Sequence, residues 1–94
     1  MCGIAGIISD KKTKQAEIEI LFKFLKNRGP DAKNYIKIND KLILGHTRLS
    51  IIDLDNRSNQ PMMTRSKRNI IVFNGEIYNY KKLKDEYFND FVFR

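Results

Sequence analysis

Gly3-Ile4-Ala5-Gly6-Ile7-Ile8 is the stretch that decides the fold. Its isoleucines and small residues, directly behind Met1-Cys2, predict a buried β-strand that begins almost at the amino terminus. A helix with one apolar face is predicted next, because four apolar residues recur at i, i+3, i+4 and i+7: Ile18, Leu21, Phe22 and Leu25. Gly29 and Pro30 predict the end of that helix, with the glycine as its cap and the proline beyond it.

The remainder of the chain favours short strands. Tyr35–Ile38 and Leu42–Leu44 flank Asn39-Asp40, which predicts a hairpin. The other predicted elements are strands at Leu49–Ile52, Ile70–Phe73 and Phe91–Phe93, a long polar loop over Asp53–Arg68, and a helix over Lys81–Phe88 that packs through Leu83 and Tyr87. This order predicts an α+β fold with mostly antiparallel sheets rather than a regular βαβ alternation.

Composition narrows the class of protein. The 94 residues suffice for one small domain or part of a larger one. No apolar run approaches the ~18 residues that span a bilayer, and no signal peptide is visible, so we expect no membrane partner. One cysteine cannot form an internal disulfide, which favours a cytoplasmic location. The net charge of +7 is spread evenly along the chain, which argues against a nucleic-acid partner.

Cys2 is the residue with the clearest chemical potential. Methionine before a small residue is normally removed, which would make Cys2 the first residue of the mature chain. A free α-amino group has a pKa of about 7.7–8.0, so a useful fraction is neutral near pH 7. That amine can accept the thiol proton, and one residue then supplies both nucleophile and base. The alternative is an incidental cysteine. Gly3 would leave room for a substrate beside the sulfur.

Four segments in order carry a resemblance to a known family. They are Met1–Ile7, Arg28–Asp31, Gly45–Asp53 and Phe73–Tyr80, and Gln60-Pro61 fits the same pattern. Together they resemble the glutaminase domain of glutamine-hydrolysing asparagine synthetases, a branch of the class II, amino-terminal-nucleophile amidotransferases. Hexosamine-phosphate synthases and phosphoribosyl-pyrophosphate amidotransferases share the cysteine start. Arg48–Ile51 and Asn74–Asn79 favour the asparagine synthetase branch.

The resemblance implies a role for each matching residue. Cys2 would attack the side-chain amide of L-glutamine, and Asn74 and Gly75 would stabilise the oxyanion. Arg48 would bind the substrate carboxylate as a bidentate guanidinium. Glu76 would bind the substrate ammonium. The residues that would complete the glutamine pocket are Leu49, Ser50, Ile51 and Ile52.

Simpler interpretations stand beside these roles. Asn74-Gly75 is also an ordinary hairpin-turn dipeptide. Arg48 could be a surface arginine, and Glu76 a capping or exposed carboxylate. We interpret His46 as a structural histidine rather than a base, and His46 with Cys2 gives too few ligands for a metal site. Arg28–Asp31 is interpreted as helix termination with local hydrogen bonding near the nucleophile.

The resemblance also implies what the chain lacks. Residues 1–94 would form the first part of the glutaminase domain, a partial four-layer αββα sandwich of the amino-terminal-nucleophile hydrolase type. A synthetase domain, with its ATP and Mg²⁺, is not expected within these 94 residues, so we expect no cofactor in this chain. Unpaired sheet edges and apolar faces are expected to be exposed. Three functions remain open: a weak or inactive glutaminase fragment, half of a split amidotransferase completed by a partner chain, and a non-catalytic binding module.

Overall fold

The computed structural model describes residues 2–49 and 56–92, with the side chain of residue 56 left aside. The elements along the chain are β1 (Gly3–Ile8), α1 (Gln15–Leu25), β2 (Ala32–Asn39), β3 (Leu42–Arg48), the 3-10 helix η1 (Asn56–Ser58), β4 (Met62–Met63), β5 (Ile70–Ile71) and α2 (Tyr80–Tyr87). Two helices and antiparallel sheets in this order confirm the prediction of an α+β fold.

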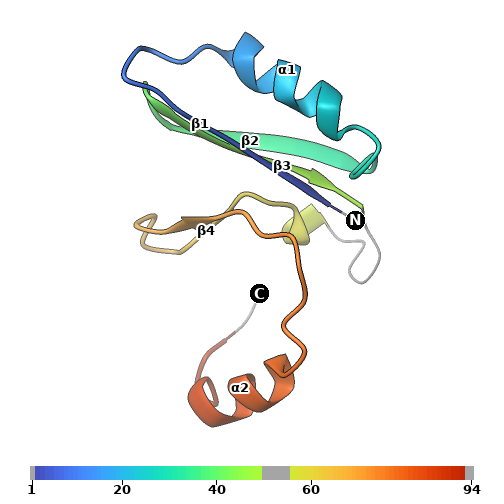
Figure 1. The fold of residues 1–94 in the computed structure, drawn as a ribbon. Helices are drawn as coiled ribbons and strands as arrows, with labels where there is room; N and C mark the ends of the chain where they lie inside the picture. Colours follow the sequence, from blue (N-terminus) through green and yellow to red (C-terminus); the bar gives the residue numbers. More distant parts are fainter. Residues whose placement is uncertain (1, 50–55, 93–94) are drawn as a thin grey trace.

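The first sheet has the order β1-β3-β2, and both pairings are antiparallel (Figure 1). The predicted hairpin is confirmed as β2–β3, and its strands are longer than the sequence indicated. β3 lies in the middle of the sheet and alternates between two covered faces, so every residue from Gly45 to Arg48 is buried. The central strand therefore brings buried polar side chains, His46 and Arg48 among them, to the face opposite α1.

Helix α1 covers one face of this sheet (Figure 1). Ile18 and Phe22 are buried against Ile43, and Leu21 is half-buried beside them, as the helical spacing predicted. Gly45 allows this contact, because a Cβ there would lie 2.8 Å from the Phe22 ring. The core of the described chain is consequently small and concentrated between α1 and β3.

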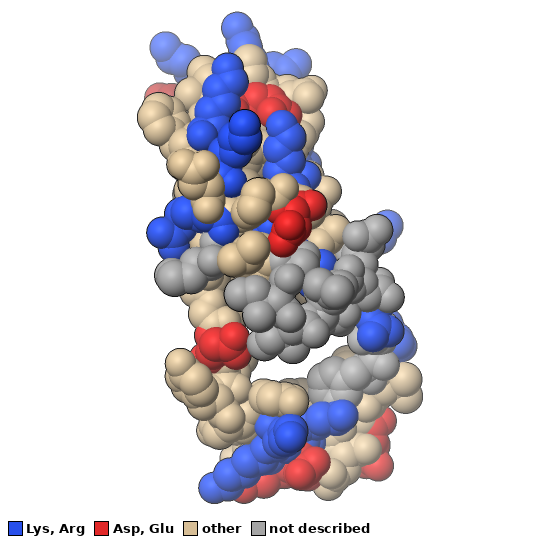
Figure 2. Space-filling model, turned by 90° about the vertical axis from the view of Figure 1, so that its right-hand side faces the viewer, with Lys and Arg blue, Asp and Glu red and all other residues tan. Residues whose placement is uncertain are grey.

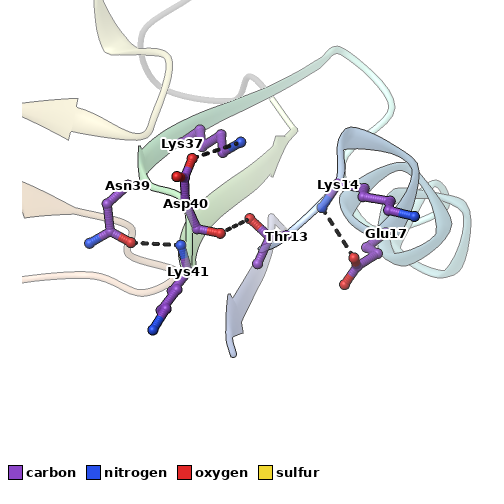
Figure 3. Close-up of polar contacts among 7 residues, drawn as sticks. All are labelled: Thr13, Lys14, Glu17, Lys37, Asn39, Asp40 and Lys41. Carbon is purple, nitrogen blue, oxygen red and sulfur yellow. Dashed lines mark hydrogen bonds and ion pairs between the residues drawn. The ribbon is translucent and has the colours of Figure 1, made fainter. Parts of the chain in front are cut away.

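The turn of the hairpin is bonded to the connection that leads into α1 (Figure 3). The Thr13 hydroxyl donates to the Asp40 carbonyl at 3.0 Å, and the Lys41 amide donates to the Asn39 side chain at 2.8 Å. The Lys14 amide donates to the Glu17 carboxylate at 3.1 Å, which satisfies a free N–H at the helix start. The bond from Thr13 to Asp40 fixes where α1 begins relative to the sheet, and the other two stabilise the hairpin turn and the start of the helix.

The predicted cap at Gly29 is wrong. Helix α1 ends at Leu25, three turn residues follow, and no glycine of the described chain has a positive φ. Gly29 instead packs against the β3 backbone, where an added Cβ would collide with Thr47 and with the Arg48 nitrogen. Glycine is required here for close approach rather than for a left-handed conformation.

The second half of the chain forms less regular structure than predicted. The expected strand at Ile70–Phe73 shortens to β5, which pairs with β4 inside the expected long loop. Leu49 lies beyond the end of β3, and the rest of the predicted strand 49–52 lies outside the described residues. Phe91 and Val92 are not in a strand, because the chain turns there and the Phe91 amide donates to the Phe88 carbonyl at 3.0 Å.

Helix α2 matches the predicted helix within one residue, but not its packing. Leu83 is half-buried, whereas Tyr87 is 71% exposed. Figure 1 shows the β4–β5 segment on the far side of the first sheet from α1, with α2 farther away again. α2 therefore contributes no buried residue to the core of the described chain.

β1 is more exposed than its sequence predicted. It is an edge strand of the first sheet, and Ile4 and Ile8 are 51% and 87% exposed. The prediction of a buried strand fails because only Gly3 of β1 is buried. Among the described residues, apolar side chains are therefore exposed along the edge strand β1, as expected for the sheet edges of this chain.

The surface carries the positive charge in several places. Figure 2 shows Lys and Arg side chains gathered at both ends of the face in view, with Asp and Glu between and beside them. Neither helix of residues 2–49 and 56–92 has the length and apolar character needed to cross a bilayer.

Candidate active site

The sulfur of Cys2 lies at the end of the first sheet. In the antiparallel β1–β3 pairing Gly3 is opposite Thr47, so the preceding Cys2 comes level with Arg48, the last residue of β3. The Leu49 amide donates to Sγ at 3.4 Å, and Sγ lies 3.8 Å from the Leu49 carbonyl oxygen. Cys2 is half-buried, so its sulfur is held by backbone on one side without being enclosed.

A second contact holds the backbone of Cys2. The Arg28 Nε donates to the Cys2 carbonyl at 3.2 Å, across 26 positions of sequence. This bond agrees with the prediction that the segment after α1 hydrogen-bonds near the cysteine. Gly3 does not provide open space there, because an added Cβ would lie 2.7 Å from the Thr47 hydroxyl. Cys2 is thus held between the end of α1 and the end of β3.

Arg48 is the last residue of β3 and is only 7% exposed, so the simpler interpretation as a surface arginine is wrong. Its Nη1 donates to the Asn59 side-chain oxygen at 2.8 Å, and its carbonyl accepts from the Asp31 amide at 2.9 Å. Leu49, whose amide donates to the Cys2 sulfur, is the next residue after Arg48. The guanidinium therefore belongs to the same end of the sheet as the sulfur.

The side chain of Gln60 forms hydrogen bonds with both the amide and the carbonyl of Phe73. The Phe73 amide donates to Gln60 Oε1 at 2.5 Å, and Gln60 Nε2 donates to the Phe73 carbonyl at 3.1 Å. Gln60 follows Asn59, the partner of Arg48, so the two loops meet at this point. Sequence reasoning noticed Gln60 only as part of a motif and missed Asn59, since no local pattern reveals a partner eleven positions away.

The predicted oxyanion pair follows Phe73 immediately. Asn74, Gly75 and Glu76 are exposed, and no hydrogen bond among the described residues joins them to Cys2 or Arg48. The next element is α2, so these residues do not form a β-hairpin turn. The structure thus brings Cys2, Leu49 and Arg48 together, and connects the Asn74 segment to them through Asn59 and Gln60.

His46 is buried beside these residues, at 1% exposure. Neither ring nitrogen has a hydrogen-bond partner of good geometry among the described residues. Burial lowers the pKa of His46 from 6.5; the adjacent Phe73 backbone opposes this shift and the Arg48 charge adds to it. A neutral, enclosed imidazole fits the interpretation of a structural histidine rather than a base.

Three predicted pocket residues, Ser50, Ile51 and Ile52, lie outside the described residues. The described residues that line two cavities of this structure do not include Cys2 or Arg48. One of about 560 Å³ lies between α1 and the start of β2, and one of about 910 Å³ lies between residues 57–67 and Phe91-Val92. Over residues 2–49 and 56–92, no three His, Cys, Asp or Glu side chains group as a metal site would require.

Comparisons with known proteins point to one family. A family model described as a glutamine amidotransferase domain matches residues 1–94. The chain is 39% identical to a putative asparagine synthetase [glutamine-hydrolyzing] of Methanocaldococcus jannaschii, over 93% of this chain and 20% of that protein. It is 38% identical to asparagine synthetase B of Escherichia coli, over 100% of this chain and 17% of that protein.

A similar relation holds for asparagine synthetase 1 of Bacillus subtilis, at 38% identity over 92% of this chain and 14% of that protein. The chain spans about a fifth or less of the length of these relatives. No solved structure matches it significantly. The match over all 94 residues shows that this chain belongs to the glutamine amidotransferase domain family.

Proposed function

We propose that the chain is the nucleophile-bearing part of a glutaminase domain of the asparagine synthetase type, acting in the cytoplasm. Cys2, exposed as the first residue by removal of Met1, is the nucleophile. The observation that carries the proposal is the position of the Cys2 sulfur, which lies 3.4 Å from the Leu49 nitrogen. Leu49 directly follows the buried Arg48.

The reaction uses the two groups of the terminal cysteine. The α-amine takes the thiol proton, and the thiolate attacks the carboxamide carbon of glutamine to give a tetrahedral oxyanion. The oxyanion collapses, the C–N bond breaks, and the α-ammonium of Cys2 passes its proton to the leaving amide nitrogen, so that ammonia leaves and a γ-glutamyl thioester remains. Water then attacks the thioester, which releases glutamate and restores the thiol.

The other predicted residues bind and orient glutamine in this proposal. Arg48 pairs with the α-carboxylate, and Glu76 pairs with the α-ammonium. The Asn74 side chain and the Gly75 amide donate to the oxyanion, and losing one such donor typically costs about 10²–10³-fold in rate. The pocket is completed by Leu49, Ser50, Ile51 and Ile52.

The fold is proposed to be the first part of a four-layer αββα sandwich. The order of layers in Figure 1, from α1 through the first sheet and β4–β5 to α2, supports this arrangement. The ammonia would serve asparagine synthesis from aspartate in a synthetase domain outside these 94 residues, and that domain would hold ATP and Mg²⁺. We expect the isolated chain to have little activity.

The test is mass spectrometry of the purified chain after treatment with the glutamine analogue 6-diazo-5-oxonorleucine. We expect loss of Met1, one adduct on Cys2, and slower labelling in the presence of glutamine. Cys2→Ser should give no adduct. A folded chain that keeps Met1, or that reacts at the same rate with and without glutamine, would contradict the assignment.

A second candidate is half of a split amidotransferase completed by another polypeptide. The observation that favours it is the exposed, uncharged edge of β1, where Ile4 and Ile8 lie beside unpaired backbone. This candidate predicts that a polypeptide carrying the rest of the domain restores glutaminase turnover on mixing. If labelling and turnover are both absent in the mixture, a non-catalytic binding module is the remaining function.

A further inference from the structure

His46 occupies the space between β3 and the Phe73 segment. Gly45 and Thr47 face α1 and its last residue, since the ring of Phe22 lies against Gly45 and the Thr47 hydroxyl donates to the Leu25 carbonyl at 3.5 Å. Because side chains alternate along a strand, His46 faces the opposite side. There it lies beside the Phe73 backbone and the Arg48 charge, and it is 1% exposed.

The two ring nitrogens require partners. A neutral imidazole has one N–H donor and one acceptor nitrogen, and burial favours that neutral form. A buried polar group without a hydrogen bond destabilises the fold, so such groups are normally paired with protein or with an ordered water. Neither nitrogen has a partner of good hydrogen-bond geometry among the described residues, although the Phe73 backbone interacts with the ring, so both nitrogens still need a well-formed hydrogen bond.

The Phe73 carbonyl can supply one partner. It accepts Gln60 Nε2 at 3.1 Å, and a carbonyl oxygen has a second lone pair. The Gln60 side-chain oxygen also accepts a hydrogen bond from the Phe73 amide, so the Phe73 backbone is already held by Gln60. Asn74 and Gly75 follow Phe73 directly, and their direction depends on how firmly this peptide is held.

We propose that His46 is a positioning residue that holds the Phe73 carbonyl through one ring N–H and binds a buried water at its other nitrogen. With Gln60 it forms a two-sided clamp on the Phe73 peptide. The clamp orients Asn74 and Gly75, which directly follow Phe73. Its effect on the rate of reaction at Cys2 rests on the proposed function. His46 itself touches no reacting atom.

NMR tests the clamp without reference to activity. His46 is the single histidine of the chain, so a long-range ¹H–¹⁵N spectrum of the imidazole has no overlap. We expect one neutral tautomer at pH 7, with a slowly exchanging N–H that couples to its ring nitrogen. An averaged pair of tautomers with a rapidly exchanging N–H would overturn the clamp.

Two variants test its effect on Phe73. His46→Leu removes both hydrogen bonds, whereas His46→Asn keeps one donor and one acceptor. We expect amide exchange at Phe73 to accelerate about tenfold or more in the Leu variant and to recover in the Asn variant. Equal exchange rates in all three proteins would overturn the clamp. If the Leu variant does not fold, the comparison of wild type with His46→Asn and the tautomer measurement decide.

The diazo-oxonorleucine reaction separates this inference from the proposed function. For His46→Leu we expect the maximal labelling rate to fall about tenfold and the half-saturating reagent concentration to stay unchanged. The His46→Asn variant should restore the rate. A purely structural histidine would leave the maximal rate of the folded protein unchanged. If wild-type Cys2 does not react while the tautomer and exchange results hold, the proposed function fails and the clamp stands.

Discussion

Arg48 shows how a single buried side chain constrains the site. The residue is 7% exposed and its guanidinium is bonded to Asn59, so the group is held in place before any substrate binds. A pre-positioned planar fork suits a carboxylate better than a lysine ammonium does, because two parallel hydrogen bonds fix the orientation as well as the charge.

Arg48→Lys should therefore weaken glutamine binding while leaving the chain folded. One lost hydrogen bond to a charged group corresponds to about 1.5–3 kcal/mol, or about 10–100-fold in affinity. The measurement is the glutamine concentration that protects Cys2 from iodoacetamide. Arg65→Lys, an exposed site, is the matched control. Equal protection in both variants would remove Arg48 from the glutamine pocket.

His46 gives stability a pH dependence whose sign follows from its environment. Burial lowers its pKa in the folded chain below 6.5, so the unfolded chain binds a proton more readily. The free energy of unfolding should be constant above about pH 7 and should fall as the pH drops below the unfolded value. Urea unfolding at pH 7.5 and pH 5.5 measures this, and His46→Asn should remove most of the difference. A wild-type chain as stable at pH 5.5 would show that the imidazole is not enclosed.

For individual residues, sequence reasoning succeeded where the motif is specific. It predicted that the segment containing Arg28 bonds near Cys2. It could not predict Asn59 or the Gln60 clamp on Phe73, because those partners meet only through the tertiary fold. The roles of Asn74, Gly75 and Glu76 remain predictions, since no hydrogen bond of the described chain ties them to the cysteine.

Among the elements, α1 was the most predictable, because a helical apolar face carries its own period. Strands were harder. Their boundaries depend on partners, so β3 extends past its apolar run while the Phe91 segment forms no strand. Gly29 was misjudged for a related reason. Sequence shows a glycine after a helix, but only the packed structure shows a backbone too close for a Cβ.

Two phenylalanines of α1 provide a matched pair. Phe22 is 4% exposed and Phe24 is 81% exposed. Phe22→Ala should cost about 3–5 kcal/mol, which is comparable with the whole stability of a small domain, so we expect its helical circular dichroism to be largely lost at 25 °C. Phe24→Ala should change stability by about 0.5 kcal/mol or less. Similar losses in the two variants would contradict the packing of α1 on β3.

For the whole molecule, the two edges of the first sheet differ. β2 carries Lys33 and Lys37 and has a bulge near its end, and both features disfavour pairing with a further strand. β1 has no charged residue, and Ile4 and Ile8 project into solvent. The composition of the chain could not reveal this asymmetry, because it depends on which strands lie at the edges.

Ile8→Lys should therefore reduce self-association of the chain. A charge on the unprotected edge disfavours further pairing, so we expect a lower average mass in sedimentation velocity at high protein concentration. Ile20→Lys introduces the same charge on α1 at a side chain that is 54% exposed. If both variants reduce association equally, net charge rather than the β1 edge is responsible.

The tight contact at Gly29 bears on how a mutational scan of this chain should be interpreted. Nearly every substitution there would force the β3 backbone away from the end of α1, in a segment that also contains Arg28 and Asp31. Such a scan would score position 29 as intolerant, and its neighbours as partly so. Intolerance at position 29 would reflect the close backbone contact between Gly29 and β3. It would not by itself show that Gly29 binds glutamine.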